Sequence, residues 1–349
     1  MLEEIRQQPE ALNKTLETGL RGIFDLRHHF EKNRPRFILM VARGTSDNAA
    51  QFGRYLIEIT TQIPVSLAAP SVLTLYGSEL NLRDVLVIGI SQSGESTDTN
   101  AVLEDARRRG ATTIGITNEI RGAMGKVVEY PIFIQAGGER SVAATKTYTG
   151  QLLILYLIAY ALSGDVQLDD LKRVPEWAER VLDLEENIEQ LAERYFFMTR
   201  AVTVGRGLNY ANALEFGLKL METCYVVAER FSAADLMHGP IALVERAFPV
   251  FVFAPTGVTW PSIAGVLDRL SELKAEILVV TDQRNMEARS KAARVVSLPA
   301  PPEFQSAIPD LYTPIPYIIP AQLFAAHLSS IKGLNADSPR TISKITRTL

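Results

Sequence analysis

The sequence predicts an α/β protein with two doubly wound parallel-sheet domains that are related by an internal repeat. Two observations predict this fold. Short apolar runs rich in β-branched residues alternate with amphipathic helical stretches, which is typical of parallel strands joined by crossover helices. The chain also matches itself when Val85 is superposed on Pro249, so each half contains one copy of a β-α-β-α-β-α-β unit.

The repeat locates the strands in order. The matched strand segments are 36–44 with 200–207, 85–90 with 249–254, 111–117 with 275–281, and 131–136 with 295–300. The helices that follow the first strand of each copy read "FGRYLIE" and "FGLKLME". These matches predict an N-terminal helical segment (1–30), a first domain (31–165), a second domain (190–330) and a C-terminal tail (331–349). Ligands of such domains bind beyond the carboxyl ends of the strands.

Composition limits the classes of function. With 349 residues, 47% of them hydrophobic, the chain can bury a large core, and its net charge of −4 offers no basic surface for nucleic acid. The acidic, polar start is not a signal peptide, and the apolar run 152–162 is too short to cross a bilayer, so we expect a buried helix there. One cysteine and four scattered histidines predict no disulfide and no metal site. We expect a cytoplasmic protein without a cofactor.

The segment "ISQSGESTDT" (90–99) places several hydroxyls between an apolar strand and a helix that ends at "RRRG". Free N–H groups and a partial positive charge at a helix N-terminus favour an anion. The hydroxyls of Ser91, Ser93 and Ser96, with Gln92 among them, fit either a phosphate cradle or ordinary capping of the helix. The segment is neither a Walker loop nor a dinucleotide fingerprint.

A second loop supports the cradle. Thr45 and Ser46, in "RGTSDN", follow the first strand and reach the same edge of the predicted sheet. In the second copy, "PTGVTWP" (255–261) replaces "SQSGEST" and lacks its serines. We therefore expect one phosphate site in each chain.

The second copy carries groups that are suited to acid and base chemistry. Glu215, Lys219 and Glu222 share one face of the helix "NALEFGLKLMET", and His238 precedes Gly239 in a His-Gly-Pro turn. The three charged residues fit either a solvated stripe of ion pairs or a catalytic cluster. A carboxylate and an imidazole could open a sugar ring and move a proton between adjacent carbons.

Six motifs in order give the chain a family resemblance. They are "RGTSDN", "SQSGEST", "SVAATKTYTGQ" (141–151), "ALEFGLKLMET", "HGP" and "DSPRTISKIT" (337–346). Together they resemble the tandem sugar isomerase (SIS) domains of glucosamine-6-phosphate synthase and its relatives. The resemblance implies two flavodoxin-like domains, no metal, a phosphorylated amino sugar or ketose phosphate as substrate, and a homodimer with shared active sites.

The resemblance also implies roles for individual residues. Glu222 would move a proton between C1 and C2, His238 would assist ring opening, and Lys344 would contact the open-chain sugar, where it can form a Schiff base. The implied phosphate-binding residues are Thr45, Ser46, Ser91, Gln92, Ser93 and Ser96. The implied sugar-binding residues are Val142, Ala143, Ala144, Glu215, Lys219 and Ser343.

Departures from the synthase pattern favour one group of relatives. The chain begins at the isomerase half, and its single cysteine, Cys224, lies within a helix, so we expect no glutamine hydrolysis. Arg43 stands where the synthase carries cysteine, and with "APSVLTLYG" (69–77) it resembles the stand-alone deaminases of the family. We therefore expect conversion of glucosamine 6-phosphate to fructose 6-phosphate and ammonia.

Three alternatives remain open. An ammonia-dependent synthase would use the same residues in the opposite direction. A deaminase or deglycase for another phosphorylated amino sugar, such as galactosamine 6-phosphate or a fructosamine phosphate, would keep the cradle and change the sugar pocket. A non-catalytic sugar-phosphate sensor belongs to a different class, and the catalytic set of Glu222, His238 and Lys344 disfavours it.

Overall fold

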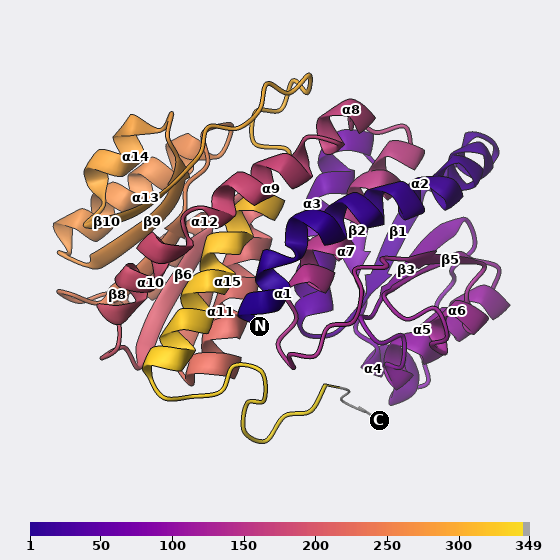
Figure 1. Cartoon of the computed structure of the whole chain (residues 1–349). Helices are drawn as coiled ribbons and strands as arrows, with labels where there is room; N and C mark the ends of the chain where they lie inside the picture. The colour runs from indigo at the N-terminus through magenta and orange to yellow at the C-terminus, as the bar shows by residue number, and fades with distance from the viewer. Residues whose placement is uncertain (345–349) are drawn as a thin grey trace. The chain divides into compact units, whose positions relative to one another are not determined.

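A computed structural model describes residues 1–344, and Figure 1 shows its helices and strands. The chain divides into two compact units, each built around one parallel sheet. Unit A contains residues 7–140, 144–172 and the tail from Ile342, and unit B contains residues 1–6, 141–143 and 173–341. The two sheets with their flanking helices confirm the α/β doubly wound fold class.

Unit A contains a five-stranded sheet of order β2-β1-β3-β4-β5, in which every pair of neighbours is parallel. Its strands are β1 (Phe37–Val41), β2 (Val65–Leu67), β3 (Val85–Ile90), β4 (Thr112–Thr117) and β5 (Tyr130–Phe133). Its helices are α2 (Gln8–Lys32), α3 (Thr45–Thr61), α4 (Ser71–Thr74), α5 (Thr97–Arg108), α6 (Met124–Val127), α7 (Lys146–Ala161) and α8 (Leu168–Leu171). Helices α2, α3 and α7 pack together, and α4, α5 and α6 form a second group.

The packing of α5 on β3 positions the hydroxyl-rich loop that joins them. Leu39 and Val87, from neighbouring strands, pack with Val102 and Leu103 of the helix. A Cβ at Gly89 would lie only 2.4 Å from Leu103 Cδ1, so a glycine is required for this close approach. As the sequence predicts, the helix ends at its arginines, with Gly110 in the left-handed region.

Unit B repeats this topology with the order β10-β9-β8-β6-β7. Its strands are β6 (Arg200–Gly205), β7 (Val227–Ser232), β8 (Pro249–Phe253), β9 (Glu276–Asp282) and β10 (Arg294–Leu298). Its helices are α1 (Leu2–Arg6), α9 (Val174–Leu182), α10 (Glu185–Glu193), η1 (Gly207–Asn209), α11 (Tyr210–Cys224), α12 (Ala233–Met237), η2 (Pro240–Leu243), α13 (Trp260–Glu272), α14 (Met286–Lys291) and α15 (Pro314–Ile331). Helices α9, α10 and α11 pack on α15, while α12 and α14 pack on α13.

The repeat predicts four strands in each copy, whereas each sheet within residues 1–344 has five. The additional strands, β2 and β7, occupy equivalent edge positions beside the first strand of their copies. Strand β2 has only three residues, and in β7 the exposed Val227 and Glu229 alternate with the buried Ala228. Edge strands pair on one side only, so they need no continuous apolar run that sequence analysis would detect.

The apolar run at 152–162 is a buried helix, as the sequence predicts. Almost every residue of α7 is buried, because the helix packs against α2, α3 and strand β4 of its own unit. Helix α15 is similarly buried along its length in unit B. No helix within the described residues 1–344 is long and apolar enough to cross a membrane.

Candidate functional site

Two loops at the carboxyl edge of the unit A sheet carry the residues that the sequence predicts for phosphate binding. Strand order reverses at the neighbouring strands β1 and β3. The loop after β1 leads into α3 at Thr45, and the loop 91–96 after β3 leads into α5. Ligands of open α/β sheets bind at such a switch point, so the fold places both loops where a ligand site is expected.

The serine hydroxyls of loop 91–96 take part in local hydrogen bonds. Ser91 Oγ accepts the Gly94 N–H at 3.1 Å, and Ser93 Oγ accepts the Glu95 N–H at 3.2 Å. Ser96, at the N-cap of α5, donates to Asp98 Oδ1 at 2.9 Å. The bonds of Ser91 and Ser93 build the turn, whereas, within the described residues, the side chain of Ser96 accepts no backbone N–H at the start of α5 and so does not cap the helix. A hydroxyl that accepts one bond still has its own hydrogen to donate to a ligand.

The loop after β1 is anchored by its neighbours. Ser46 is buried near the start of α3, and its Oγ accepts a hydrogen bond from Gln151 Nε2 of α7 at 2.9 Å. Thr45 is the first residue of α3 and is partly exposed. The two residues therefore lie where the sequence predicts them, at the start of the helix that follows β1.

Arg43 is joined to the start of α5. Its guanidinium contacts the Asp98 carboxylate through Nε and Nη2, both at 2.7 Å from Oδ2. Burial raises the pKa of Asp98, but hydrogen bonds from Arg43 and Ser96 outweigh burial and lower it overall. Asp98 is therefore an anion that is neutralised by the chain itself, and it ties the two loops together.

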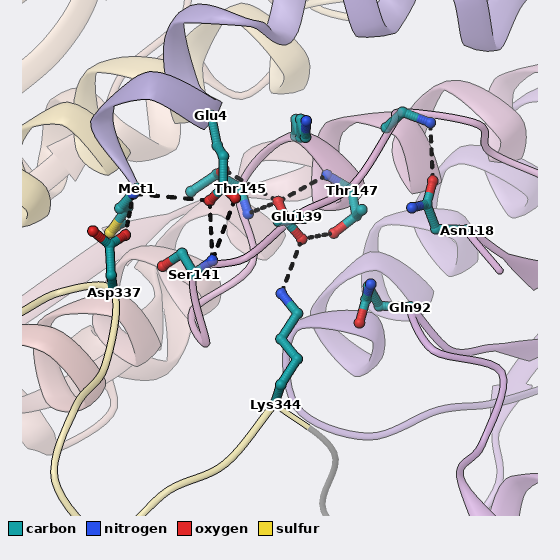
Figure 2. Close-up of polar contacts among 12 residues, drawn as sticks. Met1, Glu4, Gln92, Asn118, Glu139, Ser141, Thr145, Thr147, Asp337 and Lys344 are labelled. Carbon is teal, nitrogen blue, oxygen red and sulfur yellow. Dashed lines mark hydrogen bonds and ion pairs between the residues drawn. The ribbon is translucent and has the colours of Figure 1, made fainter.

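A cavity of about 370 Å³ opens beside these loops in unit A. Its lining residues are Gln92, Ser93, Glu95, Glu119, Arg121, Gly122, Glu139 and Lys344. The C-terminal tail thus brings Lys344 to the same cavity as two residues of the predicted cradle. Figure 2 shows its side chain pointing toward Glu139, and Lys344 Nζ lies 3.5 Å from Glu139 Oε2. Ser91, Ser96, Thr45 and Ser46 are not among the lining residues.

Sequence analysis missed Glu139 and Arg121. Arg121 lies in the loop after β4, the strand beside β3, so its position at the same sheet edge could have identified it. Glu139 directly precedes the segment "RSVAATKTYTGQ" (140–151), but the sequence gives no sign that its side chain is buried.

In unit B, α11 places a buried cluster of charged groups on one face. Lys219 Nζ lies 3.2 Å from Glu215 Oε1 and 2.7 Å from Glu222 Oε2. The side chain of Lys219 is 1% exposed, that of Glu215 0%, and that of Glu222 27%. The burial excludes the solvated stripe that the helical spacing left open. Two carboxylates share one buried ammonium, and only Glu222 reaches solvent.

The two carboxylates of this cluster favour the charged form of Lys219. Burial lowers the pKa of Lys219, but the carboxylates of Glu215 and Glu222 outweigh burial and raise it overall. Lys219 is consequently a permanent cation that holds the Glu222 carboxylate in place through a short hydrogen bond. A carboxylate that is held in this way and remains accessible has the properties of a general base.

The other predicted residues are more dispersed. His238 is exposed directly after α12, and no hydrogen bond within residues 1–344 links its imidazole to Glu222. Pro240 starts a short 3-10 helix after Gly239, whose φ is 137°. Ser343 is exposed in the tail. Val142 and Ala143 group with unit B, where the Val142 N–H donates to the Asp337 carbonyl at 3.1 Å, and Ala144 groups with unit A.

In the second copy, the loop that corresponds to 91–96 is 255–261. It is hydrogen-bonded to a side-chain carboxyl group of the protein itself. Asp282 Oδ2 accepts hydrogen bonds from the N–H and the hydroxyl of Thr256, at 3.3 and 2.8 Å. The hydroxyl of Tyr317 donates to the same oxygen at 2.9 Å. Donors of this loop that could hold a ligand are therefore already bonded to a side-chain carboxyl group. Within residues 1–344, no group of three or more His, Cys, Asp or Glu side chains is placed to hold a metal ion.

Comparison with known proteins identifies the family. The SIS domain model matches residues 33–161 and 198–332, one match in each copy of the repeat. The chain therefore belongs to the SIS domain family, and its enzyme relatives identify it as an enzyme of that family.

Similar curated proteins are longer than this chain. A glutamine–fructose-6-phosphate aminotransferase [isomerizing] of Aquifex aeolicus is 35% identical over 99% of this chain and 57% of its own length. The aminotransferase of the same name from Pyrococcus horikoshii is 34% identical over the same shares of the two chains. The chain thus spans little more than half the length of these relatives.

Solved structures agree on the fold. The C-terminal domain of glucosamine-fructose-6-phosphate aminotransferase from Francisella tularensis has a TM-score of 0.87 and 28% identity, and the match covers 97% of this chain and 98% of that domain. Glucosamine-6-phosphate deaminase from Thermotoga maritima has a TM-score of 0.78 over 99% of both chains. At 22% identity, this second similarity shows the fold alone.

Proposed function

We propose that this chain catalyses the isomerising amination of fructose 6-phosphate, in which ammonia is the amino donor and glucosamine 6-phosphate is the product. The observation that carries the proposal is the similarity to glutamine–fructose-6-phosphate aminotransferases, at 34–35% identity over 99% of this chain. This similarity favours the synthase-type reaction over the deaminase reaction that the departures from the motif pattern suggested. The buried charged cluster of α11 and the cavity beside loop 91–96 supply suitable chemistry.

Substrate binding would begin with the phosphate. Loop 91–96 offers serine hydroxyls and the N-terminus of α5, a 12-residue helix, to a dianionic phosphate. Anchoring this remote group provides binding energy that orients the reacting carbons. His238, with its exposed imidazole, would transfer the proton that opens the sugar ring.

Amino transfer would then proceed at C2. Ammonia adds to the C2 carbonyl of open-chain fructose 6-phosphate, and the carbonyl oxygen leaves as water to give an imine. Glu222 removes a proton from C1 and returns it to C2, while the hydroxyl at C1 becomes the aldehyde. The product is glucosamine 6-phosphate. Lys219 would hold the Glu222 carboxylate in place through its hydrogen bond, and Lys344 would contact the open-chain sugar at C2.

The proposal extends to assembly and location. The family resemblance implies a homodimer in which a partner copy completes each site, and we expect the enzyme to act in the cytoplasm on phosphorylated sugars. Light scattering of the purified protein tests the dimer, for which the expected mass is twice that of the 38.6 kDa chain. A monomer with full activity would contradict the shared site.

Deamination of glucosamine 6-phosphate is the second candidate. The observation that favours it is Arg43, which departs from the synthase pattern and is held by Asp98 at the start of α5. The same residues would act in the reverse order, with release of ammonia from C2. Initial rates in the two directions distinguish which reaction the enzyme favours.

The test uses the purified chain with fructose 6-phosphate and ammonium chloride, and separately with glucosamine 6-phosphate. We expect glucosamine 6-phosphate to form in the first mixture, and Glu222→Gln to lower turnover at least about a hundredfold while sugar-phosphate binding persists. Faster release of ammonia and fructose 6-phosphate in the second mixture would favour the deaminase. Heat stabilisation by both sugars without turnover would refute the enzyme and support a sensor.

A further inference from the structure

Glu139 is a buried carboxylate whose position is determined by its own segment of unit A. Its Oε1 accepts hydrogen bonds from the Thr145 N–H at 2.8 Å, the Thr145 hydroxyl at 3.2 Å and the Thr147 N–H at 3.3 Å. Its Oε2 accepts the Thr147 hydroxyl. The side chain is 0% exposed. Because four local donors hold it, the carboxylate is fixed whether or not another cation approaches.

The C-terminal tail approaches this carboxylate at Oε2. In the described structure, Oε2 lies 3.5 Å from Lys344 Nζ. Figure 2 shows the lysine extending from the tail to the carboxylate, with Thr145 and Thr147 beside it. Lys344 is 26% exposed, and both residues line the cavity that contains Gln92 and Ser93. Glu139 therefore pairs with Lys344 of the tail at the wall of the cavity that is the candidate substrate site.

Asn118 connects this wall to the cradle. Its backbone N–H donates to the Gln92 carbonyl at 3.1 Å, and its side-chain Nδ2 donates to the Gly137 carbonyl at 2.9 Å. Asn118 Oδ1 in turn accepts the Ala136 N–H at 2.9 Å. One buried residue thus fixes both the loop of the cradle and the segment that leads to Glu139. Loop 91–96 and the segment before Glu139 are therefore joined by hydrogen bonds within one unit.

We propose that Glu139 is a positioning residue that holds Lys344 over the cavity at the place where C2 of the phosphate-anchored sugar reacts. The inference rests on the proposed function, because it assigns Glu139 a task only if Lys344 contacts the sugar. Glu95, Glu119 and Arg121 also line the cavity and contribute to the charge around the lysine. Among these carboxylates, Glu139 is the buried one, and its Oε2 lies 3.5 Å from Lys344 Nζ.

Glu139→Gln is a closely matched substitution. The amide oxygen can replace Oε1 and keep the bonds from Thr145 and from the Thr147 N–H. The amide NH₂ then faces Lys344, while the Thr147 hydroxyl can reverse its role and accept. At position 139, the group that faces the lysine changes from an acceptor into a donor. Thr147→Val is the control, since it removes a hydroxyl from the same carboxylate and leaves the charge opposite Lys344 in place.

Covalent trapping measures where the lysine lies. The uncharged Lys344 amine bonds to C2 of open-chain fructose 6-phosphate, the carbonyl oxygen leaves as water, and borohydride delivers hydride to the C=N carbon to give a stable secondary amine. Mass spectrometry then locates the adduct. We expect Glu139→Gln to reduce trapping at Lys344 about tenfold and Thr147→Val to change it less than about twofold. Equal trapping in wild type and Glu139→Gln would overturn the proposal.

A double-mutant cycle tests whether Glu139 acts through Lys344. In the wild-type background, we expect Glu139→Gln to lower kcat about tenfold and to change KM less than about threefold. In a Lys344→Ala background, the same change should alter kcat less than about twofold. A full additional loss in that background would show a merely structural role. If Glu139→Gln does not fold, Glu139→Asp carries the test, because it keeps the buried charge but withdraws it from the lysine.

The outcomes separate the inference from the proposed function. If wild type turns over but Lys344→Ala is fully active, the role of Lys344 in the proposed function fails, and Glu139 has nothing to position. If Lys344→Ala is impaired and the loss from Glu139→Gln adds to it, the inference alone fails.

Discussion

The contribution of Lys219 to stability depends on its burial. An exposed lysine between two glutamates on a helix contributes a few tenths of a kcal/mol for each pair. Here Lys219 and Glu215 are fully buried, so removal of the cation leaves a buried carboxylate without its partner. Lys219→Met should therefore lower the free energy of unfolding by about 3 to 5 kcal/mol and abolish turnover. Urea denaturation measures the first effect. A loss below about 1 kcal/mol would mean that the pair is not buried in solution.

The ion pair of Arg43 and Asp98 predicts a pH dependence of stability. The pKa of Asp98 is lower in the folded protein than in the unfolded chain, so the pair stabilises the fold above the unfolded pKa of about 3.9. That contribution is lost as the pH falls through the folded pKa. Because the Arg43 side chain is half exposed, Arg43→Ala should cost about 1 kcal/mol at pH 7 and progressively less below pH 4. Urea unfolding at several pH values tests this. An equal cost at every pH would indicate lost packing instead.

At the scale of elements, the turn between β3 and α5 depends on Gly94. Its φ is 67°, and a Cβ there would lie 3.0 Å from Thr117 Oγ1, whose hydroxyl donates to the Gln92 carbonyl at 3.2 Å. Gly94→Ala should therefore destabilise the fold by about 1 to 2 kcal/mol and also weaken phosphate binding, because it disturbs the cradle loop itself.

Gly110→Ala is the matched control for this prediction. Gly110 also has a positive φ, at 83°, but a Cβ there meets nothing within 4 Å, and the residue ends α5 away from the cradle loop. Both variants should unfold at lower temperature, and only Gly94→Ala should lose part of the heat stabilisation that fructose 6-phosphate confers. Equal stabilisation of the two variants by fructose 6-phosphate would mean that the loop does not bind the phosphate.

At the scale of the whole molecule, the repeat made much of the fold predictable. The apolar runs predicted β1 and β3. The sequence also predicted correctly that residues Ser91 to Ser96 form the turn between β3 and α5. Edge strands β2 and β7 could not be found in this way, because they are short or polar. The burial of Lys219 was equally hidden, since helical spacing places charges on one face but does not show what that face packs against.

The tail shows the same limit for contacts between distant segments. Family resemblance singled out Lys344, but nothing in the sequence pairs it with Glu139, which lies far away along the chain. Such a pairing follows from tertiary packing rather than from local pattern. The hydroxyl-rich loop 91–96 was recognisable because its residues lie close together in the sequence. Residues Ile345 to Leu349, which include part of the tail motif, lie outside the described structure.

The central claim is that the chain moves a proton between C1 and C2 of a sugar phosphate, and proton exchange tests it most directly. Fructose 6-phosphate would be incubated with the protein and ammonium chloride in D₂O and followed by proton NMR. We predict that wild type exchanges a C1 hydrogen for deuterium, and that Glu222→Gln does so at least about a hundredfold more slowly. Absence of exchange in a wild-type protein that fructose 6-phosphate still stabilises against heat would contradict the proposed enzyme.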